Sequence, residues 1–296
     1  MNVDKPHRGT IFVEDGEILE QREYPAEQFV LRVRAPRCAA AALPGSFAHI
    51  TCSEGLPMRR PLSIMAADPD NGTVDFLYKI VGHGLASLSR RRVGDTVSVL
   101  GPIGNPFSAE PARPRALLLG GGVGIPPMMF LANRLKKDPT TAWDPFVFMG
   151  SEVPFPFELA DPGRLASLPE TATASLAELE EAGIPSRLAS AAGLDGCYGG
   201  YVTELAAEWL GGMDQAELDR VAVFACGPTP MLAAAAELAR RFGLPCQVSL
   251  EEFMACAVGG CAGCAVAVRT PDGVAMKRVC VDGPVFDAET VFPPAA

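Results

Sequence analysis

The sequence predicts a multidomain protein with an antiparallel β-barrel, an α/β domain built on a parallel sheet, and a small C-terminal module. Its 296 residues are enough for two or three domains. Short strand-like runs fill the first hundred residues, whereas strands and helices alternate after them, and the last fifty residues are rich in cysteine and poor in helical spacing. We place the domains at residues 1–110, 111–245 and 246–296.

The first domain is predicted from short β-like runs separated by Pro, Gly and Asp, a pattern typical of a small barrel. The runs are Thr10–Val13, Phe29–Val33, Ala48–Cys52, Leu62–Met65, Asp75–Val81 and Thr96–Val99. Four prolines then crowd a segment without periodicity: Pro102, Pro106, Pro111 and Pro114. Such a segment is typical of a linker, so the boundary falls near residue 110.

The second domain begins with a βα unit. Arg115–Leu119 has the composition of a buried strand, a glycine loop follows, and Pro126–Lys137 has helical spacing with basic residues at its end. The further predicted strands are Pro145–Met149, Arg187–Ala191, Val221–Ala225 and Cys246–Leu250, and the further helices are Val202–Leu210 and Thr229–Phe242. This alternation predicts a parallel sheet.

Charge and hydropathy exclude several classes of partner. The chain has 25 Lys and Arg against 35 Asp and Glu, and this net charge of −10 argues against binding to nucleic acid or to an anionic membrane surface. The longest apolar stretch, Ala116–Ala132, is interrupted by glycines and prolines, which a spanning helix would not carry. The N-terminal residues lack the apolar core of a signal peptide, so we expect a cytoplasmic protein with reduced thiols and small-molecule or protein partners.

Four cysteines carry the strongest signal in the chain. Cys256, Cys261 and Cys264 form C-x4-C-x2-C, and Cys280 follows after fifteen residues, which is the plant-type spacing of a [2Fe-2S] cluster. Glycines lie between them, where they allow backbone N–H groups to approach the sulfides: Gly259, Gly260 and Gly263. The alternative is structural zinc, but only one C-x2-C knuckle is present. We expect the other five cysteines to be small buried side chains, with Cys226 as the exception to examine.

Two weaker motifs lie in the barrel domain. Arg59–Ile64 falls on a predicted strand, where a guanidinium can pair with a phosphate and the Ser63 hydroxyl can reach a flavin ring edge. Gly82–Gly84 follows another strand and offers backbone amides to a pyrophosphate. Taken singly, the first motif is more often a plain strand end, and the second would pass for a turn.

Two motifs of the second domain lie where ligands of α/β sheets bind. The glycine loop Gly120–Pro127 follows a strand and opens a helix, although it departs from strict G-x-G-x-x-G. Cys226-Gly227-Pro228 ends a later strand, with a buried structural cysteine as the alternative. The three histidines are isolated, and we expect surface or packing roles for His7 and His49, whereas His83 lies inside the pyrophosphate motif.

The order of these motifs resembles the ferredoxin-NADP reductase superfamily. The stretches VSLEEFMACAVGGCAGCAV and CVDGPVFDAETV are similar to the electron-transfer subunits of NAD-dependent (class 1B) dihydroorotate dehydrogenase, and the resemblance covers essentially the whole chain. It implies FAD on the barrel, NAD(H) on the α/β domain and a [2Fe-2S] cluster on the C-terminal module.

The resemblance also implies site residues, which we carry over by position. The FAD-binding residues would be Arg60, Pro61, Leu62 and Ser63, with Ser63 near the flavin N5, and Lys79, Gly82 and Gly84 at the ribityl-pyrophosphate part. Those lining the nicotinamide side would be Gly121, Gly122, Gly124, Cys226, Gly227 and Pro228. Ser63 and Cys226 would be the catalytic residues, and Cys256, Cys261, Cys264 and Cys280 would ligate iron.

The implied function is electron transfer. A nicotinamide exchanges two electrons as hydride and a [2Fe-2S] cluster exchanges one, so a flavin must stand between them. Electrons would pass from the FMN of a separate dihydroorotate-oxidising subunit through the cluster and FAD to NAD+, in pyrimidine biosynthesis, within a heterotetramer of two subunits of each kind. The same modules also occur in a ferredoxin:NAD(P) oxidoreductase, a sulfide dehydrogenase or a hydrogenase complex, and a zinc-stapled binding module is the non-enzymatic alternative.

Two residues depart from the family pattern. Ala257 stands where the family has Gly after the first cluster cysteine, and we expect it to require a negative φ. Leu85 stands in place of a threonine and removes a hydroxyl that could contact phosphate.

Overall fold

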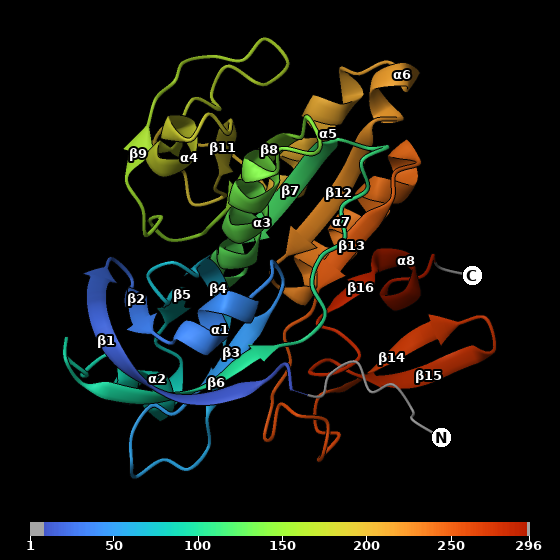
Figure 1. Cartoon of the computed structure of the whole chain (residues 1–296). Helices are drawn as coiled ribbons and strands as arrows, with labels where there is room; N and C mark the ends of the chain where they lie inside the picture. Colours follow the sequence, from blue (N-terminus) through green and yellow to red (C-terminus); the bar gives the residue numbers. More distant parts are fainter. Residues whose placement is uncertain (1–8, 295–296) are drawn as a thin grey trace.

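The computed structural model describes residues 9–294, so His7 lies outside the described part of the chain. The barrel lies below the α/β sheet in Figure 1, and the C-terminal module lies beside the barrel. This confirms the predicted fold class. Within the described residues, no helix combines the length and the apolar character needed to cross a bilayer.

The barrel is closed and antiparallel, with strand order β1-β2-β5-β4-β3-β6. Its strands are β1 Phe12–Tyr24, β2 Gln28–Arg34, β3 Phe47–Ile50, β4 Arg60–Asp68, β5 Thr73–Lys79 and β6 Thr96–Ile103. Each predicted run overlaps one of these strands, but β1 extends far beyond Thr10–Val13. The sequence did not predict this extension because most of the later side chains of β1 are polar and half-exposed. The short helices α1 (Pro36–Ala41) and α2 (Gly82–Leu88) were not predicted.

The α/β domain is a six-stranded sheet of order β11-β8-β7-β12-β13-β16. Its first five strands in this order are parallel neighbours. They are β7 Arg115–Gly121, β8 Asp144–Gly150, β11 Ser186–Ala189, β12 Val221–Cys226 and β13 Cys246–Ser249, and the main helices are α3 Ile125–Lys137, α5 Val202–Gly211 and α7 Thr229–Phe242. The predicted strands and helices of this domain are present with bounds shifted by at most two residues.

Elements without a strong sequence pattern complete this domain. They are the 3-10 turn η1 Gly122–Gly124, strands β9 Leu159–Ala160 and β10 Ser175–Leu176, and helices α4 Ala177–Glu181 and α6 Gln215–Leu218. Each spans five residues or fewer, too few to show a hydrophobic period.

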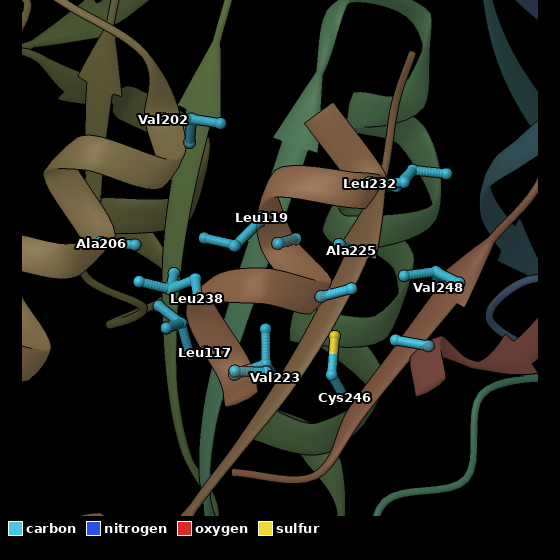
Figure 2. Packing of buried hydrophobic residues seen from close by; sticks show 14 of the residues in the cluster. Leu117, Leu119, Val202, Ala206, Val223, Ala225, Leu232, Leu238, Cys246 and Val248 are labelled. Atoms are coloured by element: carbon cyan, nitrogen blue, oxygen red, sulfur yellow. The ribbon is translucent and has the colours of Figure 1, made fainter. Parts of the chain in front are cut away.

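Both faces of the parallel sheet are buried. Leu117 and Leu119 of β7 pack with α5 and α7 on one face (Figure 2), while Ala116 and Leu118 belong to the core that includes α3. Strands covered by helices on both faces carry apolar residues continuously rather than alternately, which explains why they were recognisable in the sequence.

One prediction about this sheet was incomplete. Its edge strand β16, Val285–Asp287, pairs antiparallel with β13, so the sheet is mixed rather than wholly parallel. Three residues are too few to show the alternating pattern that predicts a strand, and the strand with which they pair lies about forty residues earlier in the chain. The remaining C-terminal elements are the hairpin β14 Ala265–Thr270 with β15 Gly273–Arg278, and helix α8 Ala288–Val291. The sheet therefore draws strands from both sides of residue 246.

Direct contacts join the three parts. Met65 of β4 and Leu77 of β5 share a core with Ile125 and Met128 of α3, so the glycine loop and the start of α3 lie against two barrel strands. Asn105, in the segment after β6, donates its backbone N–H to the Gly283 carbonyl at 2.6 Å and its side-chain amide to the Asp282 carbonyl at 2.9 Å. These two hydrogen bonds join the C-terminal module to the segment that follows the last barrel strand.

Candidate functional site

The four cysteines predicted as iron ligands lie on the loop after β13 and on the turn after β15. The Sγ atoms of Cys264 and Cys280 are 3.4 Å apart, and the Cys261 thiol interacts with Cys256. No three His, Cys, Asp or Glu side chains among residues 9–294 lie close enough together to hold a single metal ion. The thiols are arranged instead as two pairs, although their sequence separations range from two to fifteen intervening residues.

Backbone amides act on these thiols. Burial opposes ionisation of Cys256, but hydrogen bonds from the backbone N–H groups of Val258 and Cys261 outweigh it and lower the pKa of this thiol to about 7. At Cys280, burial and the neighbouring Cys264 thiol raise the pKa to about 12. A cation placed between the thiols would remove this repulsion by binding them as thiolates.

The loop fits a dinuclear iron centre. Two thiol pairs match the ligands of two irons, whereas a structural zinc site places four ligands around one ion. A Cβ added at Gly260 or Gly263 would lie 3.9 Å from Cys256 Sγ or 3.6 Å from Cys261 Sγ, so the loop backbone passes close to the sulfurs.

The expectation of a negative φ at Ala257 was wrong. Ala257 has φ 56°, in the left-handed region, and its methyl group is 1 % exposed in the core that also contains Cys264 and Cys280. The residue therefore takes the conformation that a glycine would adopt, and core packing holds its methyl group in place.

The predicted flavin strand is β4. Its side chains alternate: Leu62 packs inside the barrel, while Pro61 and Ser63 are half-buried on the outer face, toward which α3 packs. Leu62 therefore offers only its backbone to a ligand. Arg60, at the start of the strand, donates to the Met58 carbonyl at 2.7 Å.

Arg60 and the Gly82–Gly84 motif lie together. A Cβ at Gly84 would lie 2.5 Å from Arg60 Nε, so the guanidinium rests directly over this glycine. Gly82 has φ 73° with open space around it, and Lys79 ends β5 three residues earlier. A cation beside free backbone amides fits a pyrophosphate. Leu85 packs on the barrel core, so an apolar contact replaces the hydroxyl of the family pattern.

The two loops predicted to bind the nucleotide pack on each other. They leave the carboxyl ends of the adjacent parallel strands β7 and β12. A Cβ at Gly124 would lie 2.4 Å from the backbone of Cys226, and one at Gly121 would lie 2.3 Å from Met231 Sδ. Gly122, with φ 54°, is exposed, and a Cβ added there would have no heavy atom within 4 Å. These glycines permit the close approach and leave an open backbone edge, which suits a dinucleotide.

Cys226 itself is fully buried. Burial and the nearby Glu251 carboxylate raise the pKa of its thiol, so the thiol is protonated at neutral pH. Glu251 follows β13 at the same edge of the sheet, and desolvation raises the pKa of its carboxyl group although solvent can reach it. The sequence analysis did not single out Glu251 as a site residue, although a charged residue directly after a strand at this edge was a usable signal.

His49 was expected to have an ordinary surface or packing role. It is 0 % exposed on β3, opposite Pro61, and the pKa of its imidazole is lowered to about 4 by burial and by the Arg59 charge. A single polar residue in the apolar run Phe47–Ile50 was the available signal. The five cysteines outside the cluster motif are all buried, as predicted.

Comparisons with known proteins agree with this arrangement. A family model described as the iron-sulfur cluster binding domain of dihydroorotate dehydrogenase B matches residues 251–292. The electron transfer subunit of dihydroorotate dehydrogenase B (NAD(+)) from Caldanaerobacter subterraneus is 35% identical over 84% of this chain and 87% of its own length. The corresponding subunit from Geobacillus thermodenitrificans is 35% identical over 93% of this chain and 96% of its own.

A solved structure shows the same fold. The NADH-dependent reduced ferredoxin-NADP oxidoreductase, described for flavin-based electron bifurcation, matches with a TM-score of 0.74 and 28% identity over 93% of this chain and 89% of that chain. Both the sequence relatives and the family model converge on one assignment. The chain belongs to the family of electron transfer subunits of dihydroorotate dehydrogenase B (NAD(+)).

Proposed function

We propose that this chain passes electrons from the FMN of a dihydroorotate-oxidising catalytic subunit to NAD+, and so serves pyrimidine biosynthesis. The observation that carries the proposal is the arrangement of four cysteine thiols as two pairs in a module docked on the barrel. The packed glycine loops at the edge of the adjacent sheet support the nucleotide part.

Each part of the chain has a distinct task in this proposal. Cys256, Cys261, Cys264 and Cys280 hold a [2Fe-2S] cluster. Arg60 and the Gly82–Gly84 amides hold the pyrophosphate of FAD, Lys79 supports its ribityl part, and Ser63 faces the ring. Gly121, Gly122, Gly124 and the Cys226-Gly227-Pro228 turn line the site of NAD(H).

FAD when bound supplies the conversion between single electrons and hydride. The residues of this chain mainly orient the two rings, because hydride transfer depends on geometry more than on proton shuttling. The protonated Cys226 thiol and the Glu251 carboxylate lie at the edge of the sheet where the nicotinamide would bind.

The partner docks on the cluster loop in this proposal. Phe253 is 94% exposed three residues before Cys256, and Val258 is 50% exposed just after it. Exposed apolar side chains beside a redox centre mark an interaction surface. We also propose a heterotetramer of two subunits of each kind and a reducing, cytoplasmic location, the latter supported by nine cysteines without a disulfide.

The alternative is an equivalent subunit of a ferredoxin:NAD(P) oxidoreductase. The 28% identity to a protein of that kind is lower than the 35% identity to dihydroorotate dehydrogenase subunits, which favours the main proposal. The decisive experiment is reconstitution with the catalytic subunit and measurement of dihydroorotate-dependent NAD+ reduction. Activity unchanged when this chain is omitted would refute the proposal.

Replacing Cys261 tests the cluster directly. Cys261→Ser is expected to lower dihydroorotate-dependent NAD+ reduction by about a hundredfold or more, since a hydroxyl is a poor replacement for a thiolate ligand. NADH oxidation by ferricyanide, which FAD alone supports, is expected to stay within about twofold of the unchanged protein. Cys197→Ala, at a buried cysteine remote in sequence from the cluster loop, is the matched control. Full coupled activity in Cys261→Ser would contradict the ligand assignment.

A further inference from the structure

Arg278 links the two segments that carry the cluster cysteines. It is the last residue of β15, two positions before Cys280. Its guanidinium Nη1 donates to the Gly259 carbonyl at 3.0 Å, and Gly259 lies between Cys256 and Cys261. One side chain therefore connects the turn that carries Cys280 with the loop that carries the other thiol pair.

The turn side of this link is held by further hydrogen bonds. The backbone N–H of Arg278 donates to Asp282 Oδ2 at 2.7 Å, and its Nε lies 3.4 Å from the same oxygen. The Asp282 carbonyl accepts from the Asn105 side chain at 2.9 Å. Hydrogen bonds therefore run from the segment after the last barrel strand through Asp282 and Arg278 to the Gly259 carbonyl.

The bond to Gly259 fixes the peptide unit that joins Gly259 to Gly260. This peptide bond is trans, and in a planar trans peptide the carbonyl and the N–H point in opposite directions. With the Gly259 carbonyl turned to Arg278, the Gly260 N–H points away from the guanidinium. A Cβ at Gly260 would lie 3.9 Å from Cys256 Sγ, and a hydrogen bond from the Gly260 N–H is among the interactions that lower the pKa of this thiol.

We propose that Arg278 is a positioning residue that raises the reduction potential of the [2Fe-2S] cluster, because its guanidinium orients the Gly259–Gly260 peptide so that the Gly260 N–H faces the Cys256 sulfur. The proposal rests on the proposed function. Reduction adds negative charge to the ligand sulfurs, so an N–H aimed at one of them stabilises the reduced form more than the oxidised form. The Arg278 side chain is 41% exposed, so solvent screens its charge and the orientation of the peptide carries most of the effect.

The test compares two variants of the cluster-loaded protein. Arg278→Met keeps most of the apolar stem and removes the guanidinium. Lys277→Met is the matched control, because it removes the same charge from the adjacent residue, whose side chain leaves the opposite face of β15. A redox titration followed by paramagnetic resonance measures the midpoint potential of the cluster, and NADH oxidation by ferricyanide measures the flavin part.

Arg278→Met is expected to lower the equilibrium constant for cluster reduction by about tenfold, which is a shift of about 59 mV to a more negative potential for one electron. Lys277→Met changes this constant by less than about threefold, and both variants keep NADH oxidation by ferricyanide within about twofold of the unchanged protein. An unchanged or higher potential in Arg278→Met, or equal shifts in the two variants, would overturn the proposal.

If Arg278→Met does not retain the cluster, Arg278→Lys replaces it, since this side chain keeps the charge but is too short to place a nitrogen where Nη1 lies. A potential below that of the unchanged protein in Arg278→Lys supports the proposal, and an equal or higher potential overturns it. A failure of NADH to reduce the cluster through FAD in the unchanged protein would instead refute the proposed function, so the two failures are distinguishable.

Discussion

At the scale of single residues, burial separates two alanines of the cluster loop that share one backbone conformation. Ala257 and Ala262 both have left-handed φ angles, 56° and 55°. Ala257 is buried, whereas Ala262 is exposed. Their strain is the same, but only Ala257 recovers part of it through packing of its methyl group.

This difference predicts unequal responses to glycine. Ala262→Gly relieves about 1–2 kcal/mol of left-handed strain against about 0.4–1 kcal/mol of added unfolded-state entropy, so it stabilises the holoprotein by about 0.5–1 kcal/mol. Ala257→Gly also loses about 0.8 kcal/mol of methyl burial and is close to neutral. Chemical unfolding of both variants checks this, and a larger gain at Ala257 would contradict the role of the buried methyl.

At the scale of elements, the sheet edge that we propose for the nucleotide depends on how closely two strand-to-helix loops approach. The loop after β7 contacts the loop after β12 at Gly124, where a Cβ would meet the carbonyl carbon and oxygen of Cys226. Because the obstructing atoms belong to the backbone, no side-chain rotation can relieve the clash.

Gly124→Ala is therefore expected to destabilise the protein by about 1–3 kcal/mol and to weaken NADH binding by about tenfold or more. Gly211→Ala is the matched control, since Gly211 lies at the end of α5 with no atom near an added Cβ, and it should be neutral or stabilising by up to about 1 kcal/mol. Fluorescence titration with NADH and thermal unfolding measure the two effects. Normal NADH binding in Gly124→Ala would contradict the loop-packing account.

At the scale of the whole molecule, two of the exposed apolar residues lie next to segments that carry the proposed cofactor sites. Met58 is 46% exposed and directly precedes Arg59, and Phe253 is 94% exposed and directly precedes Met254. Phe253 belongs to the surface that we propose for the catalytic subunit.

Phe253→Ser is expected to weaken association with the catalytic subunit by about tenfold to a hundredfold, the equivalent of about 1.5–3 kcal/mol of lost aromatic burial. NADH oxidation by ferricyanide is unaffected because this reaction needs only the isolated chain. Val93→Ser, at a 65% exposed position on the barrel, is the control. Equal affinities of Phe253→Ser and the unchanged chain for the partner would place the interface elsewhere.

The sequence by itself determined the three-part architecture, the long buried strands and helices, and the four-cysteine motif. These features are local: strands buried on both faces are continuously apolar, helices repeat every 3.6 residues, and a metal-binding spacing is read along the chain. The elements that the sequence did not predict, such as β16 and α2, are too short to show a clear hydrophobic period. The full length of β1 was not predicted because its later side chains are mostly polar.

Only the tertiary structure decided which distant residues meet. The pairing of Cys264 with Cys280 and the contact of Gly124 with Cys226 both join segments that are separated in sequence. The sign of φ at Ala257 was likewise decided by tertiary packing, because burial of its methyl group offsets part of the cost of a left-handed alanine. Such contacts arise from closing the fold, and no local pattern encodes them.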